Sequence, residues 1–144
     1  ASAVEAEMVL TDERRFWVPC HHCGEEHVLE WRHVSIPEDA TLPSHEVYGH
    51  AQWAQAFYAC PHCGGLWDDD ERVSNIRQGH WVASQPQSDP SVVGFYTSEL
   101  YSTAEQSRVP ILARKYLEAK AKMESGEPGD MVAFWNSSLG LPWE

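Results

Sequence analysis

The sequence lacks the motifs of the common nucleotide-hydrolysing and hydrolytic enzymes. None of its nine glycines is followed by lysine, so it has no P-loop of the form G-x-x-x-x-G-K-[ST]. It also has no G-x-S-x-G elbow, no H-E-x-x-H pair and no Cys/His nucleophile arrangement. We therefore predict that this chain is not a complete enzyme by itself.

Long apolar runs are also missing. No segment approaches the roughly 18 consecutive apolar residues of a membrane-spanning helix. The first ten residues lack the basic start and apolar centre of a signal peptide. We expect a soluble, cytoplasmic protein without a membrane partner, and 42% hydrophobic residues with seven tryptophans are enough for a packed core.

Basic residues are scarce. The 144-residue chain has 10 Lys and Arg against 22 Asp and Glu, a net charge of -12. The excess acid lies in residues 1–106, with 5 basic and 17 acidic residues, whereas residues 107–144 have 5 of each. Because nucleic-acid-binding proteins neutralise phosphates with Lys and Arg, the acidic part is a poor candidate for binding duplex DNA unaided.

Four cysteines form two C-x-x-C-G motifs. The first pair is Cys20 and Cys23, and the second is Cys60 and Cys63. Two residues between thiolates let one tight turn aim both sulfurs at one ion, and a following glycine tolerates positive φ. Two such turns complete a tetrahedral shell of four sulfurs, which suits a single structural Zn²⁺ and leaves no open position for substrate. Iron in place of zinc, a redox pair and two disulfides are the alternatives.

Apolar segments flank both motifs as the strands of hairpins would. Residues 16–18 precede the first turn and residues 27–31 follow it, and residues 57–59 and 66–67 repeat the arrangement. The sequence therefore predicts a zinc ribbon of two β-hairpins. The histidines read as exposed turn residues (His21, His22 and His62) or as ordinary surface and strand residues (His27, His33, His45, His50 and His80).

The acidic run from Asp68 to Glu71 has two interpretations. Metal-dependent nucleases gather carboxylates in this way. The run also fits a helix start, with Asp68 as N-cap and Glu71 as its capping-box partner. We favour the helix start, with Val73 and Ile76 on its buried side and Gly79 as its stop. Residues 81–83 then form a strand or docking segment.

The rest of the chain reads as a second, mainly helical part. Residues 84–91 are polar and proline-containing, so we divide the chain into a zinc-ribbon module (1–83) and a strand plus two-helix segment (84–144). One helix follows Ser107, with Pro110 in its first turn. Its buried face is formed by Leu112, Tyr116, Ala119 and Met123. The second helix begins near Pro128 or Asp130 and is predicted to bury Met131, Phe134 and Trp135 before Gly140. The predicted fold class is α+β.

Basic residues line the first of these helices between positions 108 and 122. Such a stripe can follow a phosphate backbone, which makes a DNA-binding zinc module the alternative function. Glu118 and Glu124 are interspersed with it, so an ordinary solvated face is the favoured interpretation. The residues concerned are Arg108, Arg114, Lys115, Lys120 and Lys122.

Taken together, the segments resemble the large terminase subunit of lambda-like tailed phages, which cuts and packages viral DNA. The stretches that carry the resemblance are residues 11–20, the second C-P-H-C-G turn, residues 79–83, residues 94–96 with 100–102, residues 117–120 and residues 134–143. The sequence departs from the family pattern at His21, where proline is usual, and at Ser102-Thr103, which lacks a following Pro-Trp.

The resemblance implies a segment between a packaging ATPase and an endonuclease. Of the family's functional residues, only the four cysteines carry over, as zinc ligands. The predicted function is a structural zinc-binding linker in a phage terminase large subunit within the bacterial host cytoplasm. Its implied partners are the ATPase and nuclease domains of the same parent chain. DNA and other packaging components, such as the small terminase subunit and the portal, are further candidates.

Overall fold

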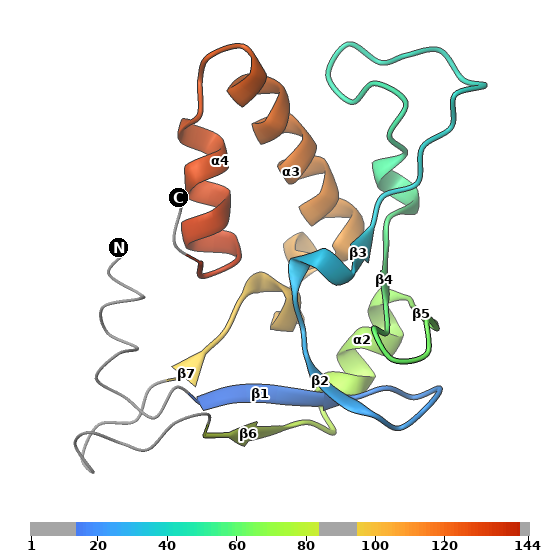
Figure 1. Ribbon diagram of the computed structural model, residues 1–144, viewed down its shortest axis with the longest axis vertical. Helices are drawn as coiled ribbons and strands as arrows, with labels where there is room; N and C mark the ends of the chain where they lie inside the picture. Colours follow the sequence, from blue (N-terminus) through green and yellow to red (C-terminus); the bar gives the residue numbers. More distant parts are fainter. Residues whose placement is uncertain (1–13, 84–94, 142–144) are drawn as a thin grey trace.

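The computed structural model describes residues 14–83 and 95–141, which form two small β-sheets followed by a mainly helical part (Figure 1). This arrangement confirms the predicted α+β class. Helices α3 and α4 lie at the opposite end of the molecule from strands β1 and β6. Among the described residues, no helix is long and apolar enough to cross a membrane.

The first sheet is built around strand β1 (Arg14–Pro19). It pairs antiparallel with β2 (Glu26–Val28) to form the first hairpin, and with β6 (His80–Val82) on its other side. Strand β7 (Phe95–Tyr96) joins β1 in parallel, through the pairs Arg14 with Phe95 and Arg15 with Tyr96. A strand from the second half of the chain therefore extends the sheet of the first half.

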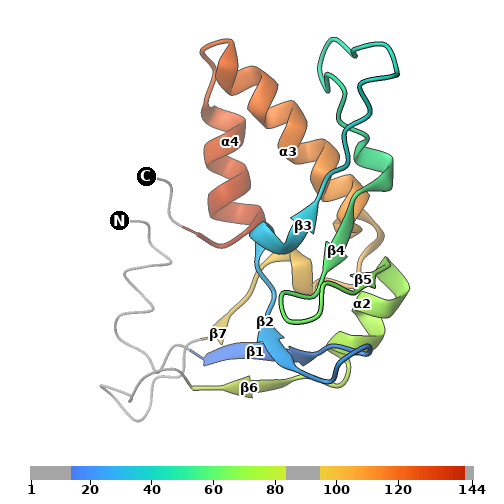
Figure 2. The ribbon, with the colours of Figure 1, turned by 45° about the vertical axis from the view of Figure 1, so that its right-hand side comes forward.

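The second sheet carries the other hairpin. Strands β3 (Val34–Ser35), β4 (Phe57–Ala59) and β5 (Leu66–Trp67) pair antiparallel in that order (Figure 2). Two 3₁₀ turns, Trp31–His33 and Trp53–Gln55, precede β3 and β4. Both predicted hairpins are present, each with a C-x-x-C turn at its tip.

Helix α2 (Asp69–Ile76) starts with the predicted capping box. The Asp68 carboxylate accepts from the Glu71 N–H at 2.7 Å, and the Glu71 carboxylate accepts from the Asp68 N–H at 2.9 Å. Ile76 is half-buried and packs against the core, as predicted, but the residues that α2 buries fully are Arg72 and Asn75. Polar contacts with other segments draw these two residues inward.

The helical part follows the predicted pattern. Helix α3 (Val109–Glu124) has Pro110 in its first turn and buries Leu112 and Ala119. Helix α4 (Gly129–Ala133) continues into a π-helical turn, Phe134–Ser138, and Gly140 follows at φ 65°. Short 3₁₀ turns at Glu99–Tyr101 and Glu105–Ser107 lead from β7 to α3.

The hydrophobic core has two clusters. One joins the hairpins to the start of α3, because Val18, Tyr58 and Trp67 lie in the same cluster as Leu100 and Leu112. The other gathers Ala119, Met131, Phe134 and Leu139 between α3 and α4. The indole of Trp31 packs against both, with its ring centroid 5.2 Å from that of Phe134.

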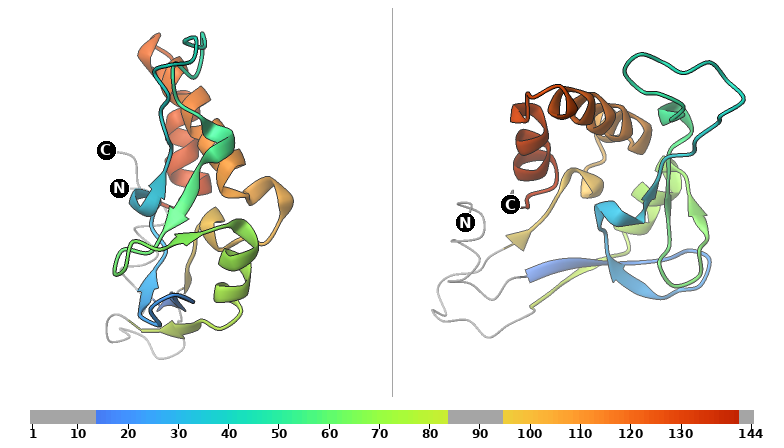
Figure 3. Two further views of the ribbon diagram at one scale, coloured as in Figure 1. Left: turned by 90° about the vertical axis from the view of Figure 1, so that its right-hand side faces the viewer. Right: turned by 45° about the horizontal axis from the view of Figure 1, so that its top comes forward.

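Residues 36–52 form a long loop. Apart from two isolated bridges, Glu38 with Ala51 and His45 with Gly49, it has no strand or helix. It projects beside α3 (Figure 3), where the Tyr48 hydroxyl donates to Glu118 at 3.1 Å. The loop is therefore anchored to the helical part.

Candidate metal centre

The two C-x-x-C turns have the same backbone geometry. In the first, Gly24 N–H donates to Cys20 C=O at 2.8 Å, and in the second Gly64 N–H donates to Cys60 C=O at 2.9 Å. Gly24 and Gly64 have φ of 78° and 74°, values that residues with a side chain rarely adopt. The glycine after each cysteine pair is therefore required by the turn itself.

The four sulfur atoms form one cluster with the dimensions of a tetrahedral site. Every sulfur lies within 4.8 Å of the other three. Cys20 Sγ is 3.8 Å from Cys63 Sγ, and Cys23 Sγ is 3.9 Å from Cys60 Sγ. With Zn–S bonds of about 2.3 Å, the edges of a sulfur tetrahedron are about 3.8 Å long. A disulfide would need about 2.05 Å, so these cysteines are free thiols.

N–H groups surround the sulfurs. Backbone N–H groups donate to three of them, from His22 to Cys20 at 3.3 Å, from His62 to Cys60 at 3.4 Å and from Gly65 to Cys63 at 3.3 Å. The buried indole of Trp67 also donates to Cys20 Sγ at 3.4 Å. Such bonds favour the thiolate, which is the form that binds a metal.

Burial and hydrogen bonding act in opposite directions on the two buried thiols. Burial raises the pKa of Cys60 to about 12. Burial also raises the pKa of Cys20, but the N–H donors from Cys23, Trp67 and His22 outweigh it and bring that pKa down to about 6. The first thiolate to form disfavours ionisation of its neighbours, so a dication is needed to hold all four as thiolates.

The first turn is tied to the second by His22. Its Nε2 lies 3.0 Å from the Leu66 carbonyl oxygen, so this nitrogen is the donor. The ring also lies against Gly65, where an added Cβ would meet His22 Cδ2 at 2.4 Å. His22 is exposed, as predicted. Its contact with the second turn was not predicted. The double glycine after Cys63 is the only sequence signal that could have indicated it.

The other histidines differ in burial. His27 was predicted to be an ordinary surface or strand residue, and it is a strand residue of β2 but only 5% exposed. Its Nε2 is 2.7 Å from the hydroxyl of buried Tyr58, which also contacts His33 Nδ1 at 3.0 Å. Burial lowers the pKa of His27 to about 4, so its ring is neutral at pH 7. The contact between His27 and Tyr58 joins the first hairpin to the second.

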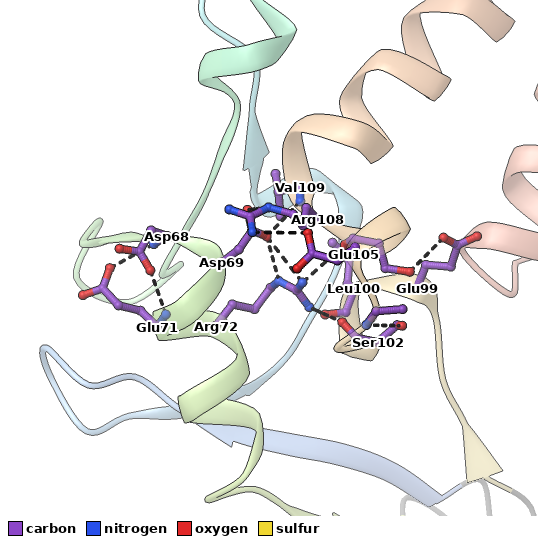
Figure 4. A network of polar contacts seen from close by, with 12 residues as sticks. Asp68, Asp69, Glu71, Arg72, Glu99, Leu100, Ser102, Glu105, Arg108 and Val109 are labelled. Carbon is purple, nitrogen blue, oxygen red and sulfur yellow. Dashed lines mark hydrogen bonds and ion pairs between the residues drawn. The ribbon is translucent and has the colours of Figure 1, made fainter.

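The acidic run at the start of α2 also reaches the second half of the chain (Figure 4). Asp69 Oδ1 accepts from the Val109 N–H at 2.9 Å and so caps α3, whose own N-cap residue makes no side-chain bond. The same oxygen accepts from the Arg72 guanidinium at 3.4 Å. Asp68 and Glu71 are engaged in the capping box, and Asp69 joins two helices.

Arg72 is the largest polar side chain in the core, at 1% exposure. Its remaining donors bond to backbone carbonyls between β7 and α3, those of Leu100, Ser102 (2.9 Å) and Ser107 (3.3 Å). With the two bonds to Asp69, all five guanidinium N–H groups have acceptors. No periodicity in the sequence could have indicated that this arginine is buried.

Four of the five basic residues between positions 108 and 122 contact groups of the same chain. Arg108 lies 3.8 Å from Asp69, and the Arg114 guanidinium lies 5.0 Å from the Trp53 ring centroid. Lys115 donates to Ser138 at 2.6 Å and contacts Glu99, and Lys122 donates to Asp130 at 2.7 Å. These contacts agree with the predicted solvated face.

Comparison with known protein families gives two matches, one on each side of residues 82–91. Residues 1–81 match the model described as phage terminase large subunit gpA, ATPase domain. Residues 92–144 match the model described as terminase large subunit gpA, endonuclease domain. No curated protein and no solved structure gives a significant match.

Proposed function

The chain belongs to the phage terminase large subunit gpA family, and on this premise we propose that it is a zinc-stabilised junction between the ATPase and endonuclease regions. The chain contains parts of both regions: residues 1–81 match the ATPase domain and residues 92–144 match the endonuclease domain. The role is mechanical: it keeps the two regions in a fixed relation during DNA packaging.

The four-cysteine cluster supports a structural zinc. All four cysteines needed for a tetrahedral shell are present at suitable separations, so a bound ion would have no open position for water or substrate. Zinc binding to such sites is worth about 10–16 kcal/mol near neutral pH, comparable to the net stability of a whole domain. Folding of the hairpins would then depend on the metal.

The observation that carries the proposal is the Asp69–Arg72 network (Figure 4). Both residues lie in the ATPase match, and every group that their side chains bond outside α2 lies in the endonuclease match. Arg72 is 1% exposed and the Asp69 side chain 11%, so solvent competes little for the bonds between them. The β1–β7 pairing and the shared core add two further links across the same boundary.

We propose no catalytic role for the chain itself, and we assign ATP hydrolysis and DNA cleavage to the rest of the parent protein. Its immediate partners are then the ATPase and nuclease domains of that protein in the bacterial host cytoplasm. The alternative of DNA binding through residues 108–122 gains no support, because Arg108, Arg114, Lys115 and Lys122 contact groups of the same chain. Contact with the small terminase subunit or the portal remains compatible with this role.

Elemental analysis tests the proposal. Protein purified without added zinc should contain one zinc per chain. A Cys60→Ser/Cys63→Ser variant should lose the metal, and its circular-dichroism spectrum should become that of an unfolded chain. His62→Ala is the matched control, because His62 lies in the same turn without being a predicted ligand, and it should keep the metal. A folded wild-type chain without metal would overturn the proposal.

A further inference from the structure

A second group of metal-binding side chains lies beside the four cysteines. It consists of His21 and His22, from the first C-x-x-C turn, and Glu71, from the first turn of α2. One nitrogen from each ring and one carboxylate oxygen lie within 4.8 Å of one another. We propose that these three residues form an exposed, exchangeable site for a divalent transition-metal ion such as Zn²⁺, distinct from the four-cysteine centre.

The donor set suits this class of ion. Two imidazoles and one carboxylate are a recurrent zinc ligand set, and imidazole selects transition metals over Mg²⁺ or Ca²⁺. Ligands bound tetrahedrally at about 2.0–2.2 Å lie about 3.3–3.6 Å apart, so His21 Nε2 and Glu71 Oε2, 2.7 Å apart, must separate to admit the ion. Both histidines and the Glu71 carboxylate are at least partly exposed, so water and an ion can reach their ligand atoms. Three protein ligands leave a position open, which makes the ion exchangeable.

Two of the ligands are already oriented by other groups. Glu71 Oε1 accepts from the Asp68 N–H at 2.9 Å, which leaves Oε2 toward His21 at 2.7 Å. His22 donates from Nε2 to the Leu66 carbonyl, so its free lone pair is on Nδ1. A backbone carbonyl that fixes the tautomer of a histidine is the usual outer partner of a metal ligand.

His21 has an outer partner as well. Its Nδ1 lies 3.0 Å from the side-chain amide of Asn75, which is only 2% exposed. Without metal, the proton on Nε2 is shared with Glu71. With metal, Nε2 would become the ligand and Nδ1 would carry the proton, and this Nδ1–H would donate to Asn75 Oδ1 after a half-turn about the terminal bond of the asparagine. Burial of Asn75, for which the helical pattern gives no reason, follows from this contact.

The second C-x-x-C turn provides the contrast. Pro61 occupies the place of His21, and the ring of His62 faces His27 at 5.9 Å instead of a carboxylate. Electrostatics also favour the first turn, because Asp68 and Asp70 lie beside Glu71, whereas the charge of Asp69 is compensated by Arg72. These carboxylates outweigh the roughly half-unit positive charge of the helix N-terminus.

An ion at this site would connect the first turn to α2, the helix that carries Asp69 and Arg72. The junction would then be stiffer when the ion is bound. The inference rests on the proposed zinc centre, because zinc at the cysteines holds the turn that presents both histidines.

Equilibrium dialysis followed by elemental analysis tests this site separately from the first. With zinc in excess, wild type should hold two ions per chain and Glu71→Gln only one, with at least tenfold weaker second binding. Glutamine preserves the capping box, so the helix start is kept. His62→Ala should still hold two.

Cobalt identifies the ligands. Co²⁺ added to the zinc-loaded chain should give weak ligand-field bands without thiolate charge transfer, and these bands should be lost in Glu71→Gln. One zinc in wild type, or equal second binding in wild type and Glu71→Gln, would overturn the second site and leave the first intact. Thiolate charge transfer alone would also overturn it, because cobalt would then have replaced zinc at the cysteines. A chain with no zinc at all would overturn the proposed function itself.

Discussion

Arg72→Met removes the buried guanidinium while keeping a side chain of similar length. Asp69, at 11% side-chain exposure, would lose its buried cationic partner and keep only Arg108, a half-exposed cation 3.8 Å away. The carbonyls of Leu100 and Ser107 would lose their buried donors. Breaking a buried ion pair from one side costs about 3–5 kcal/mol, because the remaining charge stays buried with too little compensation. We expect the free energy of unfolding to fall by about that amount.

A double-mutant cycle combines Arg72→Met with a second variant, Asp69→Asn. Asparagine retains an oxygen that can cap α3 at the Val109 N–H, but it removes the negative charge. In the double variant no charge is left unpaired, so its loss of stability should be smaller than the sum of the single losses by at least about 1 kcal/mol.

The assay is urea unfolding of the zinc-saturated chain, followed by tryptophan fluorescence. Arg77→Met is the matched control, because Arg77 is an exposed arginine at the end of the same helix. Its effect should stay within about 0.5 kcal/mol. A loss below about 1 kcal/mol in Arg72→Met, or simple additivity in the double variant, would refute the idea that the two residues join the halves of the chain as a unit.

Three further predictions concern the metal centre and its support. Gly65→Ala should lower stability by about 1–3 kcal/mol in thermal melting, because its Cβ would displace the His22 ring, whereas Gly129→Ala, with open space around it, should not. Trp67→Phe removes the indole donor to Cys20, so competition with a chelator should show about 10–100-fold weaker zinc binding, and unchanged affinity would contradict that role. The lowered pKa of His27, about 4, means that the unfolded chain binds more protons between about pH 6.5 and 4, so the stability that neutral His27 contributes is present above pH 6.5 and decreases toward pH 4. At saturating zinc, His27→Gln should therefore lose less stability than wild type between pH 7 and 5.5, and equal losses would argue against this assignment.

Local features of the fold could be predicted because neighbours in the chain determine them. The C-x-x-C-G spacing specifies a turn with a glycine at positive φ, and Gly24 and Gly64 adopt it. The capping box of Asp68 and Glu71 spans three residues and forms as predicted. The apolar spacing of α3 likewise identified Leu112 and Ala119 as buried.

The family membership was also readable from the sequence alone. The order and spacing of the short matching segments indicated a terminase large subunit, and the two family matches confirm it. The division into residues 1–83 and 84–144 stays a prediction. The clustering of the four sulfurs is observed, and their role as zinc ligands is the proposal that elemental analysis tests.

The sequence by itself determined the two hairpins, the clustering of four cysteines at their tips and the helix starts, because each depends on contacts within a few residues or on the demands of one ion. Only the tertiary structure decided which polar residues are buried. Arg72 meets carbonyls 28 to 35 residues further along the chain, and Asn75 meets His21 54 residues earlier. Such residues look like surface residues in any local pattern. A buried charge or amide is stable only where distant segments supply its hydrogen-bond partners.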